Sequence, residues 1–151
     1  MVVKNIFEKD VFEETQTRIL ALLPESQPLW GKMTVSQMLA HLSAMADVIT
    51  ADAPPPRMFA GRLVGWALKG KLTDDKPMPK NLPTAPSFLI KEDKNLDKER
   101  NQLLQQLQLL KAKGEQGVHN IAHPFFGKLS GKEWGMGTWK HFDHHLKQFG
   151  V

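Results

Sequence analysis

Two helix-start signals, nearly a hundred residues apart, constrain the fold of this chain more than any other feature. Thr34–Gln37 and Ser130–Glu133 each carry a hydroxyl residue three positions before a Gln or Glu. This is the capping-box pattern, in which two side chains satisfy free N–H groups at the start of a helix. After the first signal, apolar residues recur at intervals of three and four: Val35, Met38, Leu42, Met45 and Ile49. The spacing predicts an amphipathic helix that ends within Asp52 to Pro56.

Further helices follow from the same periodicity. We expect helices over Glu8 to Leu23, Arg57 to Leu72 and Asn95 to Lys113, and a final helix from Ser130. Pro24 stops the helix over Glu8 to Leu23, and Gly114 stops the helix over Asn95 to Lys113. Gly61 and Gly65 weaken the helix over Arg57 to Leu72. The stretches 71–86 and 115–129 are expected to be loops, and no alternation of period two is long enough to predict a sheet.

These elements predict an all-α domain. A chain of 151 residues, 41% of them apolar, fits a single domain over 1–151. The expected architecture is an up-and-down four-helix bundle with a short extra helix. A Pro-rich insertion, Ala51 to Pro86, interrupts it.

Composition excludes several function classes. Cysteine is absent, so thiolate metal ligands, disulfides and a cysteine nucleophile are excluded. The net charge is +4 with the lysines scattered, which favours a solvated lysine face over nucleic-acid binding. The longest apolar stretch, Met58 to Leu68, contains Arg62 and is too short to cross a bilayer. We expect no membrane partner and a cytoplasmic location.

Histidines are the candidate metal ligands. His141 and His145 are four residues apart in the final helix, so their imidazoles lie on one face. His41 lies beside the apolar stripe of the helix predicted to begin at Thr34, three residues after Met38. Three histidines from two helices would form a metal site with an open coordination position. Spacing alone leaves the alternatives open: His41 as a satisfied core histidine, and the pair as a solvated helix end.

Other residues are candidates for supporting roles. His144 and His123 are acid or base candidates if either faces the site. For His144 a fourth ligand, a second-shell donor and a surface or rim position are all open, with the surface or rim favoured. Gln148 is a second-shell candidate, with a core-edge amide as the alternative. Asp143 points away from the His141/His145 face and is a poor ligand candidate. Phe125, Phe126 and Trp139 are the candidates for walling an apolar pocket, with ordinary packing as the alternative.

The motifs resemble a known superfamily. Thr34–Leu42 resembles the second-helix motif of the DinB/YfiT-like four-helix bundles, and His141–Gln148 resembles their H-x-x-x-H-x-x-Q motif. More narrowly, His123–Leu129, with Trp134 and His144–Gly150, is similar to the uncharacterised branch called DUF1569. The similarity spans Phe7 to Val151.

The resemblance implies a DinB-like bundle that holds a divalent metal, zinc or nickel, through His41, His141 and His145. Some members of that superfamily are transferases that activate a low-molecular-weight thiol, whereas others hydrolyse or isomerise. A small-molecule substrate, a thiol cosubstrate and a homodimer are the corresponding expectations. The insertion could reshape or cover the mouth of the metal site.

Three functions remain open from the sequence. The first is a metal-dependent thiol transferase or hydrolase, in which a metal held by three neutral imidazoles deprotonates a bound thiol or water. The second is a metal-binding protein without catalysis, such as a sensor or a stress-linked binding protein. The third is a structural helical bundle that holds no metal.

Overall fold

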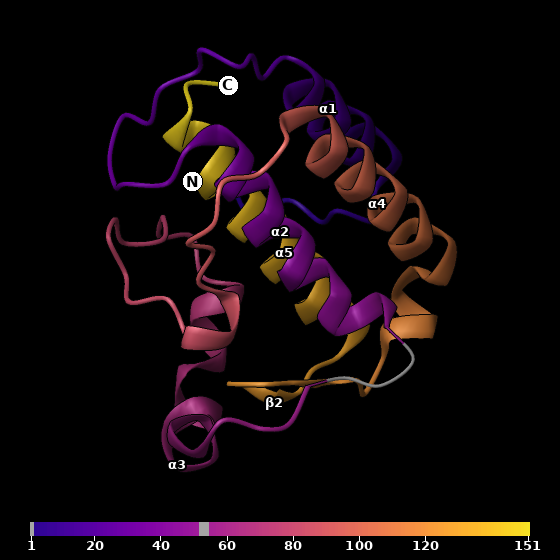
Figure 1. Ribbon diagram of the computed structural model, residues 1–151. Helices are drawn as coiled ribbons and strands as arrows, with labels where there is room; N and C mark the ends of the chain where they lie inside the picture. The colour runs from indigo at the N-terminus through magenta and orange to yellow at the C-terminus, as the bar shows by residue number, and fades with distance from the viewer. Residues whose placement is uncertain (1, 52–54) are drawn as a thin grey trace.

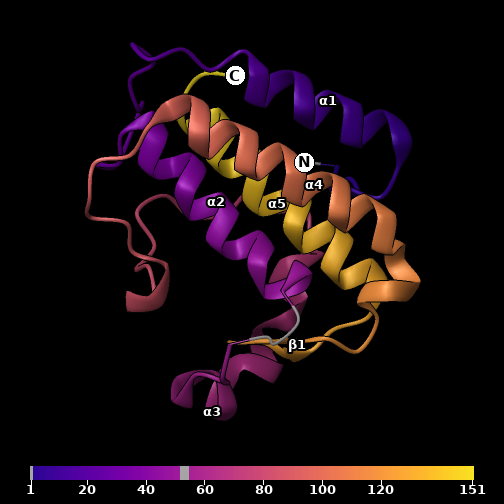
Figure 2. The ribbon, with the colours of Figure 1, turned by 45° about the vertical axis from the view of Figure 1, so that its right-hand side comes forward.

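A computed structural model describes residues 2–51 and 55–151, and these residues are mostly helical. Four helices lie side by side: α1 (Lys9–Leu20), α2 (Val35–Thr50), α4 (Leu96–Val118) and α5 (Gly131–Gln148) (Figure 1). α2 packs along α4, which also contacts α5 and α1. A shorter helix, α3 (Phe59–Leu68), lies apart from these four, beyond one end of α2 and α5 (Figure 2).

Both predicted capping boxes are present. The Gln37 N–H donates to Thr34 Oγ1 at 3.2 Å, and the Thr34 N–H donates to Gln37 Oε1 at 2.9 Å. Ser130 and Glu133 exchange the same pair of bonds at the start of α5. Each box fixes the residue at which its helix begins. The positions of His41 along α2 and of His141 and His145 along α5 are set from those starts. α2 ends at Thr50. Of the predicted stop at Asp52 to Pro56, positions 52–54 lie outside the described residues.

The core lies between α2, α4 and α5. The predicted stripe of α2 is buried at Met38, Leu42 and Ile49. Facing residues from α4 and α5 are buried with it: Leu103, Leu107, Leu110, Phe142 and Leu146. Burial of a side chain of this size contributes about 1.5–3 kcal/mol, so packing against α4 helps to hold the two histidine-bearing helices, α2 and α5, in one core.

Two helix ends differ from the prediction. α1 ends at Leu20 rather than Leu23, because the chain turns at Ala21 and buries Leu22 from outside the helix. α4 continues past Lys113 to Val118. Gly114 does break the helical geometry there, with a φ of 61°. The chain nevertheless resumes for another turn that buries Val118.

The predicted helix over Arg57 to Leu72 is divided. α3 is followed by a 3-10 turn, η1 (Lys69–Leu72), and a second such turn, η2 (Pro86–Phe88), lies near the end of the Pro-rich insertion. The Lys140 ammonium, buried on α5, donates to the Lys71 carbonyl at 2.7 Å and to the Asp74 carboxylate at 2.5 Å. These bonds hold the insertion against α5.

A short antiparallel hairpin forms where only a loop was expected. Its strands are β1 (Ala122–His123) and β2 (Gly127–Lys128), each too short to produce an alternating pattern. The hairpin lies on α3, where a Cβ atom added at Gly65 would be 2.0 Å from the Phe125 carbonyl oxygen. Gly65 is therefore required for close approach, and its weakening of the helix is secondary.

The outer face of α3 is apolar. Phe59 and Trp66 are 77% and 73% exposed, and the predicted homodimer remains a prediction. Among residues 2–51 and 55–151, we found no helix long and apolar enough to span a membrane.

Candidate metal centre

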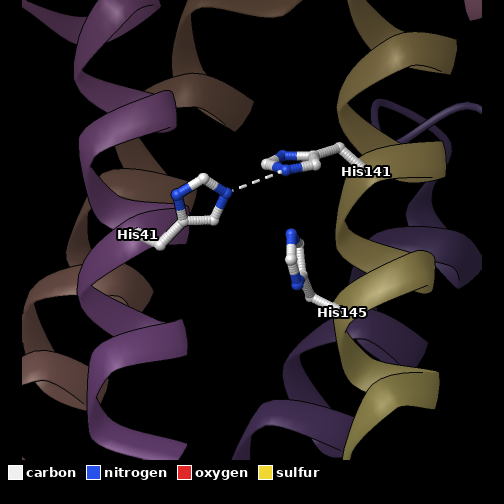
Figure 3. Close-up of side chains that lie close together, drawn as sticks. All are labelled: His41, His141 and His145. Atoms are coloured by element: carbon white, nitrogen blue, oxygen red, sulfur yellow. Dashed lines mark hydrogen bonds between the residues drawn. The ribbon is translucent and has the colours of Figure 1, made fainter. Parts of the chain in front are cut away.

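α2 and α5 bring His41, His141 and His145 together. One nitrogen from each ring can be chosen such that all three lie within 4.8 Å of one another. His41 projects from α2 toward α5, and the other two rings project back from successive turns (Figure 3). The Nε2 atoms of His41 and His141 are 3.1 Å apart. The predicted three-histidine group is therefore present as a geometric cluster.

In His41 and His145, a hydrogen bond to one ring nitrogen determines which nitrogen faces the other histidines. His41 Nδ1 lies 3.0 Å from the Phe88 carbonyl oxygen, which can only accept, so Nδ1 carries the proton. Gln148 Nε2 donates to the Trp30 carbonyl at 2.6 Å, which orients its Oε1 toward His145 Nδ1 at 2.8 Å. Both rings consequently direct an unprotonated Nε2 toward the centre of the cluster, as metal-binding histidines do.

Burial keeps these rings neutral. It is the largest cause lowering the pKa of His41 and His141, and it lowers the pKa of His145 to about 3. The neighbouring imidazoles lower the pKa values of His141 and His145 further, because like charges would repel. At neutral pH all three rings are therefore in the uncharged form that binds metal.

Two of the three residues between His141 and His145, Asp143 and His144, have other partners. His144 lies against Trp30, with ring centroids 5.5 Å apart, and does not belong to the three-histidine group. Asp143 is buried and accepts from Arg18 at 2.9 Å and from Lys147 at 2.7 Å. Asp143 is thus an ion-pair partner, in agreement with its expected orientation away from the histidines.

A cavity of about 760 Å³ adjoins the centre. His141 forms part of its wall, together with Met45 of α2 and residues of the hairpin and the Pro-rich insertion. The wall also includes Pro77, Met78, Leu82, His123, Phe125, Phe126 and Trp134. The predicted wall residues Phe125 and Phe126 thus line it. Trp139 does not: it is buried in the core.

His123 has its protonation fixed by the hairpin turn. Its Nδ1 accepts from the Phe125 N–H at 3.0 Å and from the Phe126 N–H at 3.2 Å. Burial, followed by the nearby Arg57, lowers its pKa to about 4. His123 is therefore neutral near pH 7 with its proton on Nε2, which makes it a hydrogen-bond donor and a poor base.

Comparison with known families places this site in context. The family model described as "Protein of unknown function (DUF1569)" matches residues 8–150. The chain belongs to the DUF1569 family. That DUF1569 match includes all three histidines, the hairpin and the Pro-rich insertion. No curated protein and no solved structure matched the chain.

Proposed function

We propose that this DUF1569 protein binds one divalent metal ion, zinc or nickel, through His41, His141 and His145, and that it is a metal-dependent thiol transferase or hydrolase. One observation carries the proposal: the three neutral imidazoles converge, and two of them have their tautomers fixed by Phe88 and Gln148. Burying polar rings in a helical core needs compensation, and a shared metal would supply it for the ring nitrogens that face one another.

The donor set fits such an ion. With metal–nitrogen bonds of about 2.0–2.1 Å, nitrogens in a tetrahedral arrangement lie about 3.3 Å apart. The His41–His141 separation of 3.1 Å is close to that value. The group of three contains no carboxylate. When bound, a divalent metal with three neutral ligands and an open position lowers the pKa of a coordinated water toward about 7 and deprotonates a coordinated thiol.

The surrounding residues would supply the remainder of the site. Gln148 and the Phe88 carbonyl hold two ligand rings in place. Pro77, Met78 and Leu82 of the insertion, with Phe125 and Phe126 of the hairpin, wall an apolar space beside His141. Such walls exclude water from a bound electrophile. The nucleophile would be water or a low-molecular-weight thiol, since the chain has no cysteine.

We also propose that the fold is a single DinB/YfiT-like domain, an up-and-down four-helix bundle. The packing of α1, α2, α4 and α5 supports this assignment. The motif Thr34–Leu42 and the H-x-x-x-H-x-x-Q motif at His141–Gln148 support it as well. Both motifs lie on the two helices that carry the three-histidine group.

A metal-binding protein without catalysis is the second candidate function. His144 favours it, because this ring is 5.0 Å from His145 between centroids and could restrict the open position. The cavity beside His141 favours catalysis instead, because it leaves space for a substrate next to the ligand set.

Reconstitution with cobalt(II) tests the proposal. A site with three histidines and an open position should give the intense visible absorption of four-coordinate cobalt. Adding 2-mercaptoethanol should then produce a sulfur-to-cobalt charge-transfer band in the near ultraviolet. His141→Ala should abolish both signals, whereas His119→Ala, a histidine outside the group, should retain them. A cobalt spectrum that thiol and hydroxide both leave unchanged would contradict the enzyme proposal and favour the non-catalytic one.

A further inference from the structure

The wall of the cavity beside His141 shows what kind of molecule it can hold. Most of its lining is apolar: Met45, Leu72, Met78, Leu82, Phe125, Phe126 and Trp134 contribute side chains. Its volume, about 760 Å³, is within the range of sites that enclose a small organic molecule, about 300–1,000 Å³. A ligand buried here therefore needs a largely apolar body.

Two charged groups of the wall, Lys140 and Glu133, already have partners of opposite charge within the protein. The Lys140 ammonium is buried and donates to the carbonyls of Lys71 and Asp74 and to the Asp74 carboxylate. Glu133 accepts from the Ser130 N–H in its capping box and pairs with Lys69 at 3.2 Å.

The remaining lysines of the wall are exposed to solvent. Lys71 and Lys76 line the cavity with side chains that water can solvate. A charged ligand would therefore lose its hydration without gaining a free counter-charge in the interior.

His123 differs from these groups because its proton is unused. Nδ1 is occupied by two backbone N–H donors of the turn, which leaves the proton on Nε2. Among the described residues, Nε2 has no hydrogen-bond partner, and the ring lines the cavity. Its packing against Phe126 and Trp134, with centroids 4.8 and 5.3 Å away, fixes the ring plane. A fixed donor in an apolar wall selects for a ligand with a matching acceptor.

We propose that this cavity binds an uncharged, largely apolar organic molecule bearing a carbonyl-type oxygen, and that the Nε2–H of His123 donates to that oxygen. The inference rests on the proposed function where it makes this molecule the substrate of the metal centre. His123 is then a specificity-determining residue for the oxygen.

A matched set of ligands tests the inference by displacement of the fluorescent ketone Prodan from purified protein. The competitors are 2-acetylnaphthalene, 2-ethylnaphthalene, which lacks the oxygen, and 2-naphthoate, which is charged. Wild type should bind the ketone more tightly than the hydrocarbon or the anion. In His123→Asn, the Asn oxygen can still accept from the Phe125 N–H, as Asn does in turns, but the Nε2–H donor is lost. We expect this variant to bind the ketone about fivefold more weakly than wild type does, so that its affinities for the ketone and the hydrocarbon are nearly equal.

Three results would overturn the inference: no displacement by any competitor, equal losses for ketone and hydrocarbon in His123→Asn, or tightest binding of the anion. His41→Ala separates this inference from the proposed function, since His41 is outside the cavity wall. If wild type binds no metal but His41→Ala and wild type share the ketone preference, only the proposed function fails. If metal binds and the ketone preference is missing, only this inference fails.

Discussion

At the residue scale, the proposed metal centre depends on groups that would not bind metal themselves. The Phe88 carbonyl and the Gln148 amide select the nitrogens that His41 and His145 present. Gln148 can do this only because the Trp30 carbonyl occupies its amide nitrogen at 2.6 Å. The orientation of one ligand ring is therefore set by a chain of hydrogen bonds that begins in a loop more than a hundred residues away.

Replacing Gln148 should weaken the site without dismantling it. In Gln148→Met, the His145 ring loses the acceptor that fixes its tautomer, so zinc affinity should fall about 10–100-fold, the usual cost of removing such a partner. Competition with a chromophoric zinc indicator measures this change. Gln102→Met, at an exposed position of α4, is the matched control and should bind zinc like wild type. Equal affinities in Gln148→Met and wild type would show that the amide does not orient the ring.

His123 should make the fold sensitive to acid. Its pKa is about 4 in the folded chain and 6.5 in the unfolded chain, so the unfolded chain takes up the proton first as the pH falls. The stabilisation is complete above pH 6.5 and is lost progressively as the pH falls toward 4. Between pH 7 and pH 5 this histidine should cost about 2 kcal/mol of unfolding free energy. Urea unfolding of metal-free protein should show a smaller loss of unfolding free energy between pH 7 and pH 5 in His123→Asn, because Asn cannot titrate. An unchanged loss would contradict the lowered pKa of His123.

At the element scale, the cavity depends on how closely the hairpin approaches α3. The Phe125 carbonyl oxygen would lie 2.0 Å from a Cβ at Gly65 and 2.4 Å from one at Gly61. The Met58 N–H donates to the Pro124 carbonyl at 2.9 Å and joins the two elements. Because Phe125 and Phe126 line the cavity, α3 supports the wall without forming most of it.

A single methyl group should separate these elements. In Gly65→Ala the hairpin backbone must move away from α3, so we expect a loss of about 1–3 kcal/mol in unfolding free energy and weaker Prodan binding. Gly70→Ala is the control, because a Cβ there meets no atom within 4 Å. It should leave both quantities near wild type. A Gly65→Ala protein as stable as Gly70→Ala would contradict this role for the glycine.

The sequence predicts some elements well and others poorly, for physical reasons. The capping boxes and the stripe of α2 are local patterns, so both helix starts and the register of His41, His141 and His145 follow from them. The Phe88 and Trp30 carbonyls are backbone atoms and leave no signature in the sequence. The hairpin strands have two residues each, too few for periodicity. Gly65 appears only as a poor helix former until its contact with Phe125 is known.

At the scale of the whole molecule, one arrangement of helices places the three-histidine group beside the cavity. α2 and α5 present the three-histidine group, and the same faces continue into the cavity through Met45 and His141. The Pro-rich insertion and the hairpin line that cavity from outside the helices, with Lys140 binding the insertion to α5. The predicted all-α character agrees with the mostly helical structure.

The central claim, a metal centre made by His41, His141 and His145, is tested most directly by elemental analysis. Untagged protein, purified without chelator and then equilibrated with zinc or nickel, should contain about one metal ion per chain. His41→Ala and His141→Ala should contain almost none, because three ligands are needed to hold the ion, while His119→Ala should match wild type. Wild-type protein that stays metal-free after equilibration, or variants that keep a full ion, would contradict the three-histidine centre.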